Sequence, residues 1–307
     1  MRVFAERAAA IVAVPLLLVL TARLAGAQDH DHEGGTGGPR VVETHRWTDP
    51  EGRLMAFYSA ALAFSPVGAP RMVTAPWGGT FGLELSYVPS LSQAQRSAGF
   101  SKTESTNLAP VIPRPRFALT LPAGFSIEGS WIPPMRAFGV RANVFGAAIA
   151  RPFTIAGNVI LTPRIAGSTG SVKGPITCND DLEAQSDGDA LFYLHVCHGM
   201  ESEDRFEPDA FSGEVVATRL FRGGAIAPYA GVGVRREQTT FDVGVRYTDG
   251  SIDPNHPILE LDLTRAYGFL GASWAGPLRS ALSAEMFYAP SSLLTARIQA
   301  SMRLFGS

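Results

Sequence analysis

The chain has 307 residues, a formal net charge of -2 at pH 7, 46% hydrophobic residues and 18% charged residues. The weak charge, without a stripe of Lys and Arg, excludes a general electrostatic affinity for nucleic acid. With 32 glycines and 22 prolines, the composition is typical of many short strands joined by tight turns.

The N-terminus has the pattern of an export signal. Arg2 and Arg7 precede an apolar run from Ala8 to Leu20, and the small residues Ala25-Gly26-Ala27 follow. We therefore expect residues 1–27 to be a secretory signal peptide that is cleaved after Ala27.

Two further segments precede the main domain. Residues 28–52 are polar and glycine-rich, which predicts a flexible periplasmic segment. His30 and His32 alternate with carboxylates there, but a flexible tail rarely fixes a metal geometry, so we predict neither a metal site nor a cofactor. Within residues 53–78, the stretch 54–64 is apolar and alanine-rich without alternation, which fits a short helix capping or plugging a barrel, or an additional strand.

From residue 79 to 307, apolar and polar residues alternate in ten segments. The clearest is Leu294–Phe305, in which Ile298, Met302 and Leu304 alternate with Arg297 and Arg303. Period-2 alternation over about ten residues is typical of a transmembrane strand with one face to lipid. We predict an all-β fold, a transmembrane antiparallel up-and-down β-barrel of about ten strands, with twelve as the alternative. The ten segments are 81–88, 117–121, 125–131, 137–152, 157–172, 209–221, 225–237, 258–274, 280–288 and 294–305.

The connections between these segments sort by length. Those at 122–124, 153–157, 222–224 and 275–279 are short, which predicts periplasmic turns. The opposite side receives the long connections 89–113, 174–208 and 239–257, which we expect outside the cell.

The export signal, the alternating segments and the terminal Arg303-Leu304-Phe305 together make the chain resemble bacterial outer-membrane β-barrel proteins as a class. The resemblance implies a Gram-negative outer membrane and, as partners, outer-membrane lipid, lipopolysaccharide and the barrel-insertion machinery. Members commonly end on an aromatic residue, whereas Gly306 and Ser307 follow Phe305 here.

Cys178 and Cys197 are the two cysteines. After export we expect a disulfide between them, with free thiols as the alternative. It would close a loop of about twenty residues, worth roughly 3 kcal/mol in the chain-entropy model. The loop is acidic, which fits either a cation site or a solvated loop without a ligand.

Charged residues on the parity taken as inward form the candidate site. We expect either a network of ion pairs across a narrow lumen or a polar constriction that selects a small polar solute. Arg265 fits poorly, because it shares the outward parity of Leu261 and Leu263. The expected lumen charges are Glu84, Arg116, Glu128, Arg141, Arg164, Glu214, Arg235, Glu260, Asp262, Glu285, Arg297 and Arg303.

Three functions remain open at this point. The first is a non-enzymatic outer-membrane barrel that acts as a narrow channel or transport protein, or binds a surface ligand. The second is an outer-membrane hydrolase of lipid or peptide, with Asp253 and His256 as candidates at the outer rim. The third is a soluble secreted β-barrel or sandwich. Motifs of nucleophilic hydrolases are missing, so we predict no catalytic residue.

Overall fold

The structure is a computed structural model, and it describes residues 40–70, 77–96, 110–137, 139–178 and 197–306. The predictions for the signal peptide, for residues 28–39 with His30 and His32, and for the acidic residues 180–189 lie outside the described residues.

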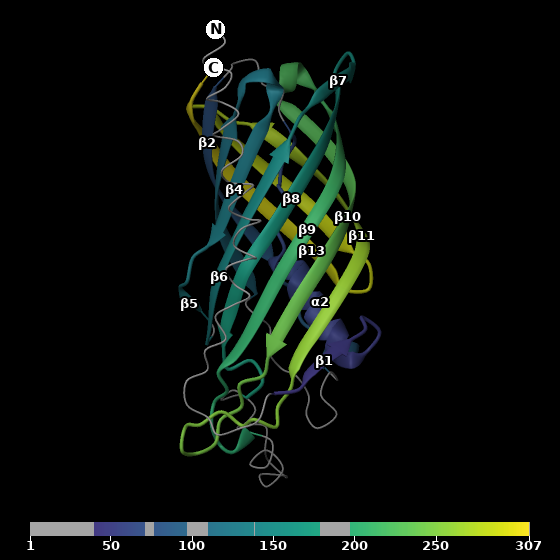
Figure 1. The fold of residues 1–307 in the computed structure, drawn as a ribbon. Coiled ribbons are helices and arrows are strands. Elements are labelled where there is room, and N and C mark those ends of the chain that lie inside the picture. The colour runs from purple at the N-terminus through teal and green to yellow at the C-terminus, as the bar shows by residue number, and fades with distance from the viewer. Residues whose placement is uncertain (1–39, 71–76, 97–109, 138, 179–196, 307) are drawn as a thin grey trace, which may run out of the picture. The chain divides into compact units, whose positions relative to one another are not determined.

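Ten antiparallel strands of the described chain close into a barrel (Figure 1), and this confirms the predicted fold class and strand number. The ring closes because the last strand pairs with the first, and β6 pairs with β8 past the short β7. The strands of the ring are β2 (Gly78–Tyr87), β3 (Val111–Thr120), β4 (Ser126–Ile132), β6 (Val140–Ala150), β8 (Val159–Gly174), β9 (Asp204–Arg219), β10 (Ile226–Asp242), β11 (Ile258–Ala275), β12 (Ser280–Ala289) and β13 (Leu293–Phe305).

The smaller elements attach to this ring. Within the described residues, three short strands pair with strands of the ring, and the helical elements are one helix of 13 residues and three shorter pieces. Among the described residues, no helix combines the length and the apolarity needed to span a bilayer. The elements are β1 (Val42–His45), β5 (Arg136–Ala137), β7 (Phe153–Ala156), α2 (Pro50–Leu62), α3 (Gln93–Arg96), and the 3-10 turns η1 (Pro122–Gly124) and η2 (Arg222–Gly224).

The two ends of the barrel differ. The short-turn end carries the connections 121–125, 151–158, 220–225 and 276–279, and the long-connection end carries 88–110, 175–203 and 243–257. The adjacent strands β8, β9, β10 and β11 have 16, 16, 17 and 18 residues, against 10 in β2, β3 and β12, so the wall is longer on that side of the barrel.

Outward and inward side chains alternate along each strand. The outer wall is apolar because many of the outward side chains are large and hydrophobic. Phe211, Val232 and Leu270 are 62%, 68% and 63% exposed. Aromatic side chains stand near both margins of this apolar belt. Exposed aromatic residues at the short-turn end are Trp77, Phe153, Phe221, Trp274 and Phe305, and those toward the long-connection end are Tyr87, Trp131 and Tyr288.

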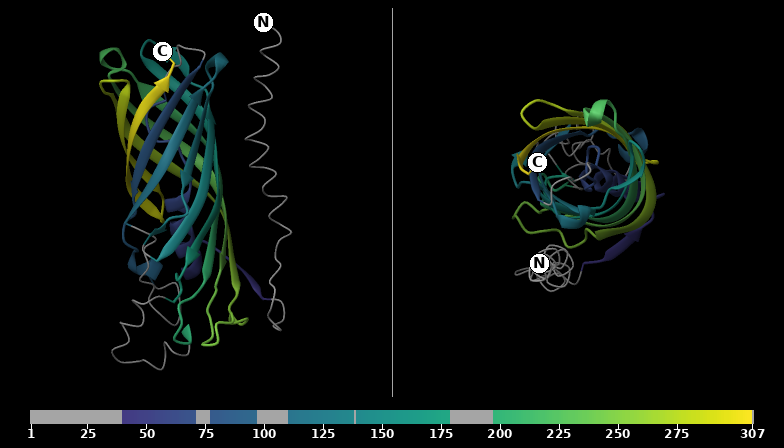
Figure 2. Two further views of the ribbon diagram at one scale, coloured as in Figure 1. Left: turned by 90° about the vertical axis from the view of Figure 1, so that its left-hand side faces the viewer. Right: turned by 90° about the horizontal axis from the view of Figure 1, so that it is seen from above.

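The lumen holds α2 and the extended residues 63–70. Seen along the barrel axis, α2 lies inside the ring of strands (Figure 2). Pro50 suits the first turn of a helix, and the next twelve residues include no β-branched side chain, which favours helix. Met55, Phe57, Tyr58 and Leu62 are buried around the helix, as expected of a helix enclosed on all sides.

The N-terminal segment enters from the long-connection end. β1 pairs in parallel with Ile258–Leu261 of β11, whose edge is free there because β12 pairs only from Gly268 onward. Arg40 adds an ion pair to Asp242 and a hydrogen bond to the carbonyl of His256, 3.1 Å. Residues 40–52 therefore lie at the end opposite the short turns. The free edge of the longest strand supplies the pairing that holds them there. The prediction that this segment is periplasmic and the prediction that the short turns are periplasmic cannot both hold.

Candidate functional site in the barrel lumen

Two arginines of the wall bind the backbone of α2, one at its C-terminal end and one at its middle. The last carbonyls of a helix have no intrahelical partner, and Arg114 of β3 satisfies two of them. Its Nη2 donates to Leu62 O at 2.9 Å and its Nη1 donates to Ala63 O at 3.4 Å. A cation at a helix C-terminus also complements the helix dipole. On the other side, Arg265 Nη2 donates to Ala56 O at 2.8 Å.

The extended residues 63–70 have no strand partner, and side chains of the wall take up their backbone groups. Arg297 Nη1 donates to Ser65 O at 3.1 Å, and Gly68 N donates to Tyr229 Oη at 2.9 Å. Buried backbone groups without such partners would be costly. The segment is therefore a bound part of the barrel. The remaining bonds run from Phe64 N to Ser168 Oγ, 3.3 Å, and from Ala69 N to Ser273 Oγ, 2.8 Å.

One ion-paired cluster joins β2, β3 and β4. Arg116 Nη1 lies 2.7 Å from Glu84 Oε2, and Arg116 also pairs with Glu128. Glu84 is fully buried and accepts a further hydrogen bond from Ser86 Oγ at 2.7 Å. The Arg116 guanidinium lies 5.1 Å from the ring centroid of Phe64, which belongs to the extended residues 63–70. The cluster thus links three strands of the wall and contacts the segment enclosed by the barrel.

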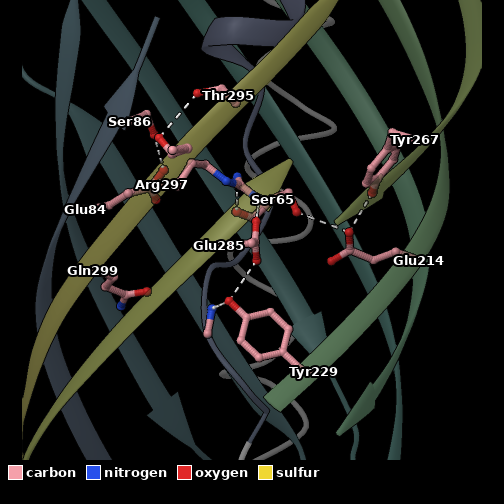
Figure 3. A network of polar contacts seen from close by, with 12 residues as sticks. Ser65, Glu84, Ser86, Glu214, Tyr229, Tyr267, Glu285, Thr295, Arg297 and Gln299 are labelled. Carbon is pink, nitrogen blue, oxygen red and sulfur yellow. Dashed lines mark hydrogen bonds and ion pairs between the residues drawn. The ribbon is translucent and has the colours of Figure 1, made fainter. Parts of the chain in front are cut away.

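A second network, shown in Figure 3, crosses the lumen from β13 to β9. Arg297 pairs with Glu285, which accepts a hydrogen bond from Tyr229 Oη at 3.0 Å. Across the lumen, Glu214 accepts hydrogen bonds from Ser65 Oγ at 3.2 Å and from Tyr267 Oη at 2.6 Å. Because Arg297 also binds the backbone of Ser65, that residue bridges the two sides. The Arg164 guanidinium balances the negative charge of Glu214, and its Nε lies 2.5 Å from Glu214 Oε1.

A third group lies beside α2. Arg265 Nη2 is 2.6 Å from Glu237 Oε2, and the Glu237 side chain is fully buried. Arg235, 2% exposed, has its guanidinium carbon 4.5 Å from the ring centroid of Tyr267 and 5.4 Å from that of Phe287. Aromatic faces thus surround a buried cation.

The structure places the expected lumen charges in two groups. Glu84, Arg116, Glu128, Arg164, Glu214, Arg235, Glu285 and Arg297 lie inside, in the contacts described above. Arg303 also faces inward and lines a cavity of about 210 Å³ at the short-turn end, together with Glu128, Arg164 and Gln299.

The prediction is wrong for Arg141, Glu260 and Asp262, which are exposed on the outer face. On β11 the inward residues are Leu259 and Leu261, packed in the same apolar cluster as Met55 and Phe57 of α2. On β6 the inward neighbours of Arg141 are the buried Val140 and the half-buried Ala142. Alternation indicates which face of a strand is shielded from water. The enclosed helix shields the part of the lumen toward the long-connection end, so the inward side chains there are apolar. The same reversal turns Arg265 inward.

Sequence reasoning missed Arg114, Glu237, Tyr229 and Tyr267. Arg114 shares the parity of Arg116, so extending the expected segment 117–121 by a few residues would have found it. Glu237 shares the parity of Arg235 and lies within the expected segment 225–237, so the alternation alone places it inside. Pro113 and Pro115 hid the beginning of β3, since proline disfavours a strand. The tyrosines were not identified because their rings read as apolar.

The long-connection end carries an ordered polar cluster. The disulfide between Cys178 and Cys197 is present. Beside it, Asp204 accepts hydrogen bonds from Ser202 Oγ at 2.7 Å and from Gly244 N at 2.8 Å, and so joins the connections on either side of β9 and β10. Asp253 lies 3.1 Å from His198 Nε2.

Asp253 is also bound by its own connection. Tyr247 Oη and Asn255 N donate to its Oδ1, each at 2.9 Å, and His256 Nε2 lies 3.6 Å from its Oδ2. Burial opposes ionisation, but the hydrogen bonds from Asn255, His198 and Tyr247 outweigh it and lower the pKa of Asp253 to about 2. Burial lowers the pKa of His256. The described residues hold no group of three or more His, Cys, Asp or Glu side chains that could bind a metal ion.

Comparisons with known proteins give a fold likeness. No family model matches the chain. No curated protein sequence matches it either. Solved structures that match are bacterial outer-membrane β-barrel proteins, among them Ail of Yersinia pestis, with 7% identity, 74% of this chain and 99% of that chain covered, and a TM-score of 0.30. The toluene transporter TodX of Pseudomonas putida matches with 11% identity over 74% of this chain and 67% of that chain, at a TM-score of 0.28. The KdgM porin matches with 7% identity over 73% and 98%, at 0.31. Likeness at this level carries no functional inference.

Proposed function

We propose that this chain is an integral outer-membrane barrel with a closed lumen, which passes its N-terminal segment through the barrel and displays it at the cell surface beside the disulfide-tied connection. Its role would be to bind a surface ligand rather than to conduct a solute. The observation that carries the proposal is the occupied lumen, in which residues 55–67 are buried and the backbone from Ala56 to Ala69 is bonded to the wall, while a cavity of about 210 Å³ remains at the short-turn end.

Membrane placement is supported by the outer wall. A soluble protein rarely exposes a contiguous apolar surface of this extent, whereas a barrel in a bilayer requires one. The strands β2, β3 and β12 have the length of about 9–11 residues that crosses a bilayer. The aromatic residues near both margins of the apolar belt suit the two interfaces.

The lengths of the connections support the proposed orientation. Long connections at the cell surface and short turns in the periplasm are the usual asymmetry of such barrels. Residues 40–49 then lie at the surface, together with Cys178, Cys197 and the cluster around Asp253. The outward pair of Arg236 and Asp262, 2.6 Å apart, stands on the part of the wall that extends above the apolar belt.

A rim hydrolase built on Asp253 and His256 has less support. The Asp253 carboxylate is already occupied by four donor side chains or backbone groups, as a residue that orders a loop would be. Its hydrogen bonds hold Tyr247, Asn255 and His198 in one arrangement.

Labelling of intact cells tests the display. Cysteine replaces Trp47, which is 47% exposed at the long-connection end, or Leu278, which is 90% exposed in a short turn. A membrane-impermeant maleimide should label Trp47→Cys on intact cells, and Leu278→Cys only after the outer membrane is permeabilised. The reverse pattern, or labelling of neither variant on intact cells, contradicts the proposal.

A further inference from the structure

The ladder between β3 and β4 ends before either strand does. β3 pairs with β4 from Thr120↔Ser126 to Arg116↔Ser130. Beyond that point β3 continues to Val111, paired with β2, and β4 continues to Ile132, paired with β6. The barrel wall therefore splits between these two strands on the side of the long connections.

Proline explains the split. Leu121 N donates to Phe125 O across the turn between β3 and β4, and Val88 N donates to Pro110 O on the other side of β3. Successive residues of a strand direct their hydrogen bonds alternately to its two neighbours. Odd-numbered residues of β3 therefore face β4, and these include Pro113 and Pro115. Neither has an N–H to donate. In the continued register Pro113 would stand opposite Pro133, which has no donor either.

An apolar cavity of about 70 Å³ lies at this split. The described residues that line it are all apolar. Leu62 at the end of α2 and Val172 of β8 are buried at its inner side, 2% and 1% exposed, whereas Val111 and Met135 are 43% and 60% exposed on the outer wall. The cavity thus connects the apolar belt with the core around the enclosed helix.

The depth of the outer side identifies what it meets. Val111 pairs with Tyr87, one of the aromatic residues toward the long-connection end. The cavity accordingly faces the outer leaflet of the bilayer, where hydrocarbon chains surround the wall. A polar solute would lose its hydrogen bonds to water at this lining and gain none.

We propose that this cavity is a lateral binding site for the end of a lipid acyl chain, which enters between β3 and β4 and packs against Leu62. The size favours a chain end over a whole small molecule. The cavity has about half of the roughly 150 Å³ in which a protein cavity binds benzene. The rest of the lipid stays in the bilayer. The inference depends on the proposed membrane placement, which surface labelling tests separately.

Photo-crosslinking inside the barrel tests the site. The full mature protein is reconstituted in phosphatidylcholine bilayers that contain a phosphatidylcholine with a diazirine near the end of one acyl chain. After irradiation, crosslinked residues are mapped by mass spectrometry. Crosslinks on Leu62 or Val172 are expected, because both face the inside and only a chain that passes the wall reaches them. Crosslinks on the outward Leu83 report the bulk lipid and serve for normalisation.

Two matched substitutions on β6 separate the site from general lipid contact. Ala142→Phe fills the cavity from its inner face and should reduce the inner crosslinks to background. Ala147→Phe places the same ring on the outer face of the same strand and should leave them unchanged. A Pro113→Val, Pro115→Val double variant restores two donors toward β4 and should also reduce them. Heat-modifiable gel migration verifies folding of each variant.

The proposal is overturned by two results. One is that wild-type protein crosslinks at outward residues alone. The other is that the inner crosslinks persist undiminished in folded Ala142→Phe protein.

Discussion

Arg265 Nη2 lies 2.8 Å from Ala56 O and 2.6 Å from Glu237 Oε2, so one guanidinium joins the wall of the barrel to the helix that the wall encloses. The contact binds a backbone carbonyl of α2 to a carboxylate that is itself fully buried. The charges of the lumen thus pair with one another and also bind the backbone of the enclosed segment.

Removing this arginine should destabilise the folded barrel. Arg265→Met leaves Glu237 buried with its nearest cation at Arg235, 4.0 Å away, and loss of one partner of a buried pair costs about 3–5 kcal/mol. The free energy of unfolding is measured by urea titration in detergent micelles. Arg236→Met is the matched control, since its pair with Asp262 is exposed and screened by solvent. Equal midpoints for the two variants would contradict the assigned role.

At Gly146 the wall packs so closely against the extended residues 63–70 that we expect no room for a side chain. A Cβ there would lie 2.5 Å from Phe64 Cγ and 2.5 Å from Ser130 Oγ. We expect Gly146→Ala to cost about 1–3 kcal/mol, the usual effect of overpacking. Gly213→Ala is the control, because a Cβ at this outward position meets no heavy atom within 4 Å. The same urea titration compares them, and the prediction fails if both variants match the wild type.

The disulfide should order the long-connection end rather than the barrel. Cysteine-to-serine replacement at 178 and 197 removes a loop constraint worth roughly 3 kcal/mol in the chain-entropy model. Because Cys178 N donates to Ser202 Oγ and Ser202 binds Asp204, the loss should loosen that cluster. Limited proteolysis of the refolded protein should cleave the variant faster between β8 and β9, while heat-modifiable migration is retained. A reducing agent should reproduce the effect in wild type and add nothing in the variant.

The titration of His256 should reveal its burial. Burial lowers its pKa below the ordinary 6.5, although the charge of Asp253 opposes this. A group whose pKa falls on folding contributes stability above its unfolded pKa, and the contribution is lost as the pH drops through the folded value. The cluster should therefore weaken as the pH falls below 6.5. For Asp253 the corresponding loss occurs from pH 3.8 down to about 2. Ring-proton chemical shifts of His256 check the first statement, and a midpoint at or above 6.5 would refute it.

Conductance should depend on the enclosed segment. The refolded mature protein in planar bilayers should give no discrete current steps, because α2 and residues 63–70 occupy the lumen. A variant that lacks residues 40–70 but still shows heat-modifiable migration should conduct. Reproducible steps from the intact protein would instead favour a narrow channel lined by the inward arginines and carboxylates.

The alternation of side chains determined most of the wall. In β2, β12 and β13 the outer face is apolar and the inner face carries charge, so polarity distinguishes the two faces locally. Glu84, Glu285 and Arg297 could accordingly be placed inside from the sequence. The disulfide followed from the two cysteines and export.

The contents of the lumen were decided by tertiary structure. Residues 54–64 are compatible with several conformations as a local sequence, and only enclosure by ten strands makes a helix that is apolar on all sides favourable. That helix shields the part of the lumen toward the long-connection end from water. On β11 the apolar side chains therefore face inward there, and Glu260 and Asp262 face outward. The sequence by itself thus determined most of the strands and their order, because side-chain alternation and the short turns between neighbouring strands are local features. Which face of each strand is inner, and what fills the space between them, depends on contacts between residues such as Ala56 and Arg265, far apart in the chain and adjacent only in the folded barrel.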